Sequence, residues 1–139
     1  MLADPTQMAQ LHARCFTQPR PWSDAEFADL LADRNCLTVV DPHGFAIARV
    51  VLDEAEILTI CIDPESQNQG HGSRLLAALH GAAIQRQVKT IFLEVAETNM
   101  PARRLYAASG YSEAGIRRNY YESSGKAAVH ALVLRCALK

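Results

Sequence analysis

The sequence lacks the features of a membrane protein, a secreted scaffold or a metal site. None of its 139 residues form an apolar run near the roughly 20 residues of a membrane-spanning helix, and the N-terminus has no basic start with an apolar stretch. The cysteines are too scattered for a metal knuckle or a redox pair: Cys15, Cys36, Cys61 and Cys136. The histidines show no metal-ligand spacing. We therefore expect a cytoplasmic protein with reduced thiols, no membrane contact and no metal.

The chain also has almost no excess of positive or negative charge, since its net charge is −1. We accordingly expect no nucleic-acid partner. The two halves differ, however: residues 1–66 carry four basic and eleven acidic residues, whereas residues 67–139 carry ten basic and four acidic residues. Such asymmetry indicates either an anionic ligand for one half and a cationic one for the other, or scattered solvated charge.

The length fits one domain, residues 1–139, and the 49% of hydrophobic residues are typical of a folded chain. Turn signals without repeats or linkers separate short helices and strands. Helices are expected from Asp4-Pro5 to Cys15, after Pro21-Trp22, and over Ser73–Gln87 and Asn99–Ser109. Strands are expected over Cys36–Val40, Phe45–Leu52, Glu56–Ile62, Thr90–Val95, Tyr111–Tyr121 and Ala127–Leu138. Ser23 with Glu26 predicts a capping box, and Trp22 is expected to pack on Phe27.

A glycine loop joins the third strand to the longest helix, and reads Gln67-Asn68-Gln69-Gly70-His71-Gly72-Ser73. Glycines let backbone N–H groups converge, and a helix N-terminus adds unpaired donors, so this arrangement suits a phosphate. It is neither a P-loop, which needs Gly-Lys-Ser/Thr, nor a dinucleotide fingerprint, which needs a third glycine where Leu75 stands. A glycine pair can also be purely structural. His71 is expected to face solvent beside the phosphates.

Further motifs follow in order: Leu93-Glu94-Val95, Asn99, Leu105-Tyr106 and Gly110-Tyr111. With Gln67-x-x-Gly70-x-Gly72 they resemble the GNAT superfamily of N-acetyltransferases. Within it, Asp53-Glu54-Ala55-Glu56 and Arg117-Arg118-Asn119-Tyr120-Tyr121 are similar to the bacterial ribosomal-protein-alanine N-acetyltransferases (RimI type). The resemblance covers roughly residues 20–135. It implies an α/β fold whose central mixed, mostly antiparallel sheet is flanked by helices, with splayed strands forming the acetyl-CoA cleft.

The resemblance also assigns cofactor-binding roles. The edge of Ile60, Cys61 and Ile62 would pair with the pantetheine arm and present a backbone N–H to the thioester carbonyl. The pyrophosphate would lie against Asn68, Gln69, Gly70, His71, Gly72 and Ser73. Asn99 would hold the pantetheine side, although it could equally be a plain helix cap.

Two departures from the family pattern affect this site. The usual first strand is short or missing before Asp4, and Asn68 and Ser73 stand where basic residues are frequent. Contacts to the pyrophosphate would therefore depend more on backbone N–H groups. Basic residues outside the loop could meet the adenosine phosphates: Arg74, Arg103 and Arg104.

Acetyl transfer needs a neutral amine and benefits from a proton donor to the departing thiolate. Glu94 fits the base and Tyr106 the acid, because Tyr106 lies two helical turns after Asn99 on nearly the same face. Either could instead be structural, as an edge-facing glutamate and a core tyrosine. Cys61 could be imagined as an acyl-carrying nucleophile but has no evident base, so we expect direct transfer in a ternary complex.

An α-amine has a pKa near 7.7–8.0 against about 10.4 for lysine, which favours a protein N-terminus as acceptor. The subfamily resemblance implies a ribosomal protein with N-terminal alanine, and the acidic N-terminal half would suit a basic peptide. Acceptor contacts are expected at Trp22, Glu54, Asn119, Tyr120 and Tyr121. Trp22 could instead be a core residue. The alternatives are a lysine or small-molecule amine as acceptor, a non-catalytic CoA-binding module and a plain nucleotide-binding protein.

Overall fold

The computed structural model describes residues 4–15, 21–121 and 129–138, with the backbone alone for residues 119–121. Within these ranges the helices and strands follow the predicted order α-α-β-β-β-α-β-α-β-β, with one additional 3-10 turn, η1. The helices are α1 (Pro5–Cys15), α2 (Asp24–Ala32), η1 (Pro64–Ser66), α3 (His71–Gln85) and α4 (Met100–Ala108). The strands are β1 (Cys36–Asp41), β2 (Gly44–Val51), β3 (Glu54–Ile62), β4 (Thr90–Ala96), β5 (Ser112–Tyr121) and β6 (Val129–Ala137).

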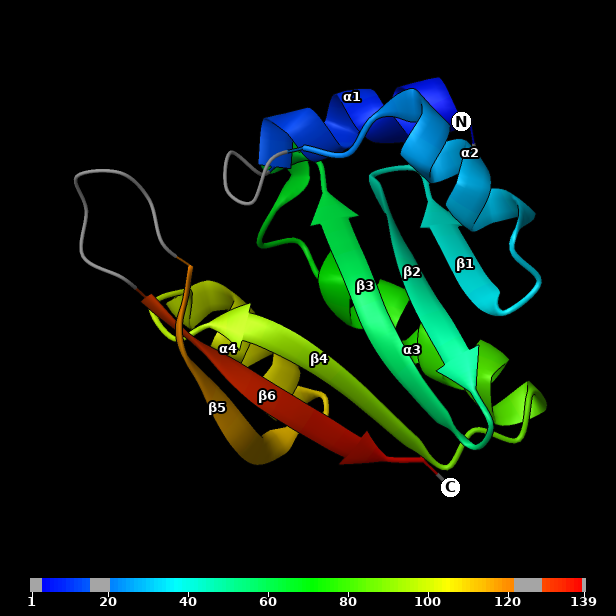
Figure 1. The fold of residues 1–139 in the computed structure, drawn as a ribbon. Coiled ribbons are helices and arrows are strands. Elements are labelled where there is room, and N and C mark those ends of the chain that lie inside the picture. The colour runs from blue at the N-terminus through cyan, green and yellow to red at the C-terminus, as the bar shows by residue number, and fades with distance from the viewer. Residues whose placement is uncertain (1–3, 16–20, 122–128, 139) are drawn as a thin grey trace.

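The strands form one sheet in the order β1-β2-β3-β4-β6-β5. Every neighbouring pair is antiparallel except β3 and β4, which are parallel and pair only over Glu54–Glu56 and Thr90–Phe92. Beyond this short contact the two strands diverge (Figure 1). The prediction of a mixed, mostly antiparallel sheet with splayed strands is confirmed.

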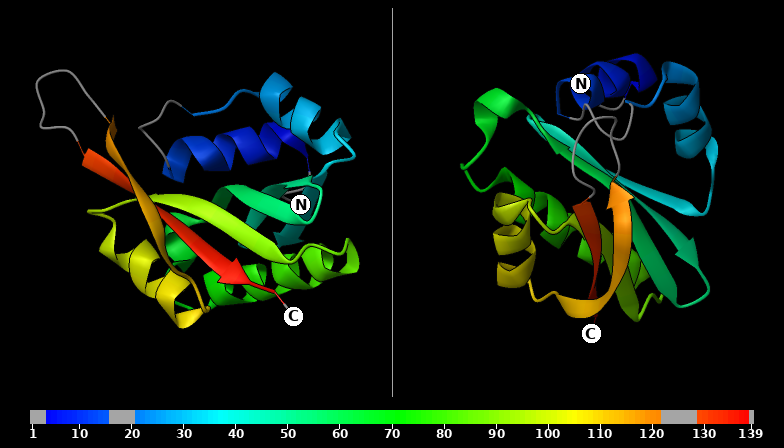
Figure 2. Two further views of the ribbon diagram at one scale, coloured as in Figure 1. Left: turned by 60° about the horizontal axis from the view of Figure 1, so that its bottom comes forward. Right: turned by 60° about the vertical axis from the view of Figure 1, so that its left-hand side comes forward.

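Helices cover both faces of the sheet. α3 and α4 lie against one face, while α1 and α2 lie on the other face, over β1 to β3 (Figure 2). A large apolar core joins α3 to the sheet through residues such as Leu76, Leu79 and Ile91. A second core lies beneath α1 and α2 around Met8 and Phe27. The strands β1 to β3 are therefore packed on both faces by two separate cores.

The start of α2 confirms the sequence prediction. The Ser23 Oγ accepts a hydrogen bond from the Glu26 N–H at 3.2 Å, and the Glu26 Oε1 accepts from the Ser23 N–H at 3.1 Å. This reciprocal pairing is the predicted capping box. The Trp22 ring lies 5.5 Å from the Phe27 ring, as expected.

Some boundaries differ from those predicted, and positive φ angles explain two of them. α3 begins at His71 rather than Ser73, because Gly70 takes a left-handed conformation (φ 83°) and starts the helix there. β3 begins at Glu54 rather than Glu56, because Leu52 (φ 57°) completes a tight turn after β2.

In the described part of the chain, no helix is both long and apolar enough to cross a membrane.

Candidate functional site

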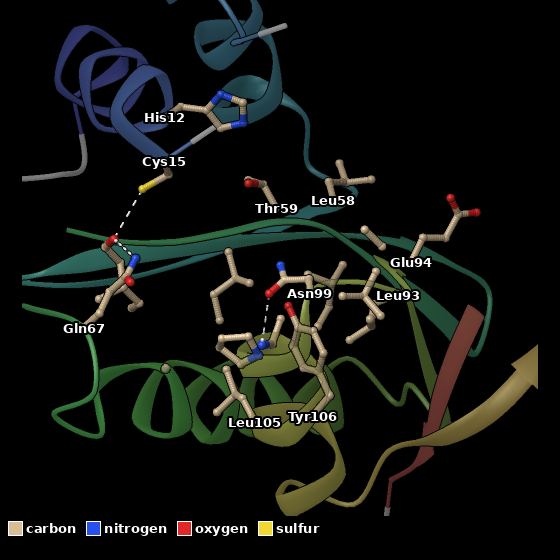
Figure 3. Close-up of a pocket in the computed structure, with 18 of the residues that line it drawn as sticks. His12, Cys15, Leu58, Thr59, Gln67, Leu93, Glu94, Asn99, Leu105 and Tyr106 are labelled. Atoms are coloured by element: carbon tan, nitrogen blue, oxygen red, sulfur yellow. Dashed lines mark hydrogen bonds between the residues drawn. The ribbon is translucent and has the colours of Figure 1, made fainter. Parts of the chain in front are cut away.

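A cleft of about 1270 Å³ opens where β3 and β4 separate (Figure 3). The glycine loop closes one end, α4 forms the floor, and α1, with His12 and Cys15, lies above β3. The sequence-predicted residues that line it are Trp22, Ile60, Ile62, Asn68, Gly70, His71, Gly72, Ser73, Glu94, Asn99 and Tyr106. Residues from distant parts of the chain thus meet in one cavity.

The β3 wall of the cleft is a strand edge that, beyond Glu56, pairs with no other strand in the described residues, and it contains a β-bulge. Ile57 pairs with Ala48 and Thr59 with Ile47, so Leu58 is an extra residue on β3. A bulge bends its strand and re-aims side chains, and Leu58 and Thr59 line the cleft. Sequence reasoning missed both residues, because an apolar strand pattern gives no sign of a bulge.

Two side chains that line the cleft hold the last carbonyl of β3. The Ile62 carbonyl accepts a hydrogen bond from the Cys15 thiol at 3.3 Å and from the Gln67 side-chain amide at 3.5 Å. Cys61 and Gln69, both expected among the cofactor residues, do not line the cleft. Cys61 is 1% exposed and packs in the core beneath α1, whereas Gln69 is exposed.

The glycine loop leads directly into the N-terminus of α3. Asn68 (φ 64°) and Gly70 (φ 83°) take left-handed conformations, which turn the chain sharply. Gly70 provides no side-chain cap for α3. The first N–H groups of the helix therefore lie at the cleft without a capping side chain, an arrangement that favours an anion.

The expectation that His71 faces solvent is wrong. His71 is 7% exposed, and its ring lies 4.1 Å from the His43 ring. Its Nδ1 contacts the Arg74 guanidinium and lies 3.7 Å from the Asp41 Oδ2. The reason is tertiary: β1 and the turn after it pack against the start of α3, which the local sequence Gly-His-Gly does not reveal.

Asn99 and Tyr106 extend from α4 on the floor of the cleft (Figure 3). The Asn99 Oδ1 accepts a hydrogen bond from the Ala102 N–H at 3.3 Å and so caps α4. Tyr106 is 6% exposed and lines the cleft, and its ring also lies 5.7 Å from the Tyr111 ring. The predicted shared face of Asn99 and Tyr106 is confirmed.

Glu94 lies on β4 at the opposite side of the opening from the loop (Figure 3). Its side chain is 24% exposed, and its Oε1 accepts a hydrogen bond from the Arg117 guanidinium at 2.7 Å. Arg117 was noted only as part of a family motif. The pairing had no local signal, because the two residues meet across β6 from strands that are not adjacent.

The part of the cleft near Trp22 combines aromatic rings with acidic groups. The Trp22 ring stacks on the His12 ring at 4.8 Å, and the backbone N–H of Trp22 donates to the His12 Nδ1 at 3.2 Å. Burial lowers the pKa of His12, and the Glu26 carboxylate partly opposes this effect. Asp29 and Glu56 also line the cleft, as does Arg49, so that with Glu26 and Glu94 the carboxylates outnumber the arginine. A cationic or amine-bearing ligand would be favoured here.

Not every expected acceptor residue lies in the main cleft. Glu54 lines a smaller adjacent hollow of about 360 Å³, which shares Glu56 and Glu94 with the cleft. Asn119, Tyr120 and Tyr121 lie in β5, but their side chains are outside the described residues. Across residues 4–15, 21–121 and 129–138, no three His, Cys, Asp or Glu side chains are grouped to hold a metal ion.

Comparison with known proteins agrees with this geometry. The sequence model described as the Acetyltransferase (GNAT) family matches residues 6–111. A [ribosomal protein bS18]-alanine N-acetyltransferase of Escherichia coli K12 is 42% identical over 108 residues, which are 75% of this chain and 73% of the relative. The Haemophilus influenzae protein of the same name is 42% identical over 122 residues, 85% of this chain and 83% of the relative.

Solved structures give the same result. The crystal structure of the ribosomal-protein-S18-alanine N-acetyltransferase from Escherichia coli superposes with a TM-score of 0.85 at 33% sequence identity. The match covers 100% of this chain and 90% of that chain. The similarity therefore extends through the whole cleft, from the glycine loop to the strands that carry Glu94 and Arg117.

Proposed function

Because the chain belongs to the GNAT family of acetyltransferases, we propose that it transfers an acetyl group from acetyl-CoA to the N-terminal α-amine of a protein. The proposal includes a ribosomal protein with N-terminal alanine as the acceptor, which is what the names of the similar bacterial enzymes state for those proteins. The observation that carries it is one continuous cleft that joins an anion-favouring loop to an acidic opening at Glu94.

The donor fits the cleft in two respects. The uncapped N-terminus of α3 and the left-handed loop would accept the pyrophosphate. The free edge of β3 would offer main-chain partners to the amide groups of the pantetheine arm, as an added strand would. The Asn99 Oδ1 already accepts a hydrogen bond in the helix cap. The side-chain NH₂ of Asn99 is therefore left to donate a hydrogen bond to acetyl-CoA.

Three groups of this chain would carry the chemistry. Glu94, as a carboxylate, takes a proton from the ammonium form of the acceptor, directly or through water, so that the neutral amine can attack. A backbone N–H at the β3 bulge stabilises the negative charge that develops on the carbonyl oxygen. Tyr106 donates its hydroxyl proton to the departing thiolate. Arg117 holds Glu94 in place through the 2.7 Å hydrogen bond.

The acidic opening supports a basic acceptor peptide. Glu26, Asp29, Glu56 and Glu94 line the cleft, and Glu54 adds a carboxylate to the adjacent hollow. These carboxylates would attract a cationic peptide and bring its amine to Glu94. The Trp22–His12 stack would form the apolar wall on which the first side chain of the peptide rests.

The decisive test offers two basic peptides to the protein with acetyl-CoA, and measures CoA release and the mass of each product. One peptide has a free N-terminal alanine, and its matched control has a blocked N-terminus and an internal lysine. We expect acetylation of the first peptide alone, at its α-amine. Transfer to the lysine would refute an N-terminal acceptor, and no transfer to either peptide would refute a protein substrate of this kind.

A further inference from the structure

Two thiols that take no part in the proposed transfer meet between α1 and β3. Cys15 is the last residue of α1, and its side chain extends toward β3 (Figure 3). Its Sγ lies 3.3 Å from the carbonyl oxygen of Ile62. Cys61, the residue before Ile62, packs its side chain in the core beneath α1, which Cys15 also contacts. The two thiols are hydrogen-bonded to each other, although residues 16–60 separate them in the chain.

The two sulfur atoms differ in how a solute can reach them. Cys15 is half-buried and lines the cleft, so a small molecule that enters the cleft can contact it. Cys61 is 1% exposed and lies behind Cys15 in the core, where its Sγ is 3.5 Å from the Thr59 hydroxyl. A dissolved oxidant therefore meets Cys15 first, whereas Cys61 is placed to react with a group formed on Cys15.

The surroundings also favour the thiolate at Cys15 rather than at Cys61. The hydrogen bond from Cys61 lowers the pKa of Cys15, and the positive charge of Arg14 acts in the same direction, while burial and Asp63 oppose them. Burial raises the pKa of Cys61. The thiolate is the reactive form of cysteine, so Cys15 is the nucleophile of the pair. A buried cysteine is often only a small packing residue, but packing does not require a second thiol between it and a cleft.

We propose that Cys15 and Cys61 form a reversible disulfide when a peroxide enters the cleft, with Cys15 oxidised first and Cys61 as the resolving thiol. The Cys15 thiolate attacks one oxygen of hydrogen peroxide, the O–O bond breaks, and hydroxide leaves as Cys15 becomes a sulfenic acid. The Cys61 sulfur then attacks the Cys15 sulfur. The S–S bond forms, the S–O bond breaks, and the hydroxyl group leaves with the Cys61 proton as water. Overall, two thiols are oxidised and one hydrogen peroxide is reduced to two waters.

The disulfide would change the cleft wall and would depend on what occupies the cleft. It would draw the Cys15 sulfur toward the core and remove the hydrogen bond from that thiol to the Ile62 carbonyl. A donor bound along β3 would cover Cys15, so the protein with an empty cleft is the form sensitive to peroxide. This dependence rests on the proposed donor, whereas the pairing of the two thiols does not. Disulfides in reducing compartments are usually transient and redox-sensing, which fits a pair of this kind.

The test treats the reduced protein with hydrogen peroxide and maps its cysteines by peptide mass spectrometry. We expect one linked peptide pair, Cys15 with Cys61, a loss of two of the four thiols, and full recovery with dithiothreitol. In Cys61→Ala the sulfenic acid is not resolved, so dimedone, which traps sulfenic acids, should label Cys15. Cys15→Ala should keep its remaining thiols over the same time.

The matched control is Cys136→Ala, which removes a buried thiol from the other core and should form the disulfide at an unchanged rate. No loss of thiols, a link between any other pair of cysteines, or a stable sulfenic acid on Cys15 in the unaltered protein would overturn the proposal. These outcomes are read on the unaltered protein, so they decide the question even if a variant does not fold.

The dependence on the cleft is tested with desulfo-CoA, which has no thiol to consume peroxide. At about ten times its dissociation constant it should slow the oxidation about tenfold, because the fraction of protein with an empty cleft falls by that factor. Equal rates with and without bound desulfo-CoA would exclude oxidation through the cleft. Absence of desulfo-CoA binding in calorimetry would instead refute the proposed donor.

Discussion

Two side chains from different elements share the proposed proton transfers. Glu94 extends from β4 and is held by Arg117, whereas Tyr106 lies on α4 and is almost fully buried. The carboxylate remains partly open to water and to an incoming amine, while the hydroxyl lies on the floor where the thioester would be. This separation allows each role to be removed without the other.

Glu94→Gln should lower kcat by about 100-fold, since general base catalysis contributes on the order of 10²–10⁴. Tyr106→Phe should lower kcat by at least about tenfold and leave the dissociation constant of CoA unchanged, because the ring is retained. Steady-state kinetics and calorimetry measure the two effects. A normal kcat in either variant would rule out the corresponding role.

The cysteines differ in reactivity because their surroundings differ. A hydrogen bond from the Cys61 thiol lowers the pKa of Cys15, whereas burial raises the pKa of Cys61. Cys15 also lines the cleft. Near neutral pH, iodoacetamide should label Cys15 well before Cys61, and saturating CoA should slow the labelling of Cys15. Peptide mass spectrometry measures both rates, and faster labelling of Cys61 would contradict the described burial.

At the scale of the elements, His80 and Tyr111 join α3 to the start of β5. The Tyr111 hydroxyl and the His80 Nε2 lie 2.7 Å apart, and burial lowers the pKa of His80. The folded protein therefore resists protonation of His80 more than the unfolded chain does. The resulting stabilisation is complete above the ordinary histidine pKa of 6.5 and is lost as the pH falls below it toward the folded pKa.

We expect the free energy of unfolding to decrease as the pH is lowered from 7.5 to 5, and to decrease less in His80→Gln, which cannot titrate. Some dependence should remain, because burial also lowers the pKa of His12. Urea unfolding at several pH values measures the difference. Identical slopes in the two proteins would show that His80 does not link α3 and β5 in this way.

Two glycines in regular elements have opposite expected responses to alanine. At Gly44, which begins β2, a Cβ would lie 2.1 Å from the Cys61 carbonyl oxygen of β3. Gly44→Ala should therefore destabilise the protein by about 2 kcal/mol or more. At Gly81 in α3 a Cβ meets nothing within 4 Å, so Gly81→Ala should stabilise it by up to about 1 kcal/mol. Chemical denaturation measures both, and a stabilising Gly44→Ala would contradict the close approach of the strands.

The elements that sequence reasoning predicted are those with local signals. Ser23 and Glu26 specify the start of α2 within four residues, and the glycine loop marks the entry to α3. The contacts that it missed depend on the sheet. The Glu94–Arg117 pair, the bulge at Leu58 and the burial of His71 all join segments at least nine residues apart. Periodicity and turn chemistry carry no information about such contacts.

At the scale of the whole molecule, the two parts of the sheet meet through a short parallel contact of three residue pairs. A ligand along the free edge of β3 would bridge them. Saturation with CoA at 100 times its dissociation constant should add about 2.7 kcal/mol to the free energy of unfolding. It should also slow amide exchange at the β3 residues that line the cleft. Thermal unfolding and hydrogen exchange measure these effects, and equal exchange with and without CoA would exclude binding along β3.

The open edge of β3 also affects how the protein behaves at high concentration. An unpaired strand edge is a template on which another chain can pair, and proteins commonly protect such edges with bulges or short strands. Here the divergence of β4 opens the edge, and the bulge at Leu58 interrupts the regular stretch available to a second molecule. If the donor binds along this edge as proposed, it would also act as a stabiliser against self-association, so that preparations without it should be the first to aggregate.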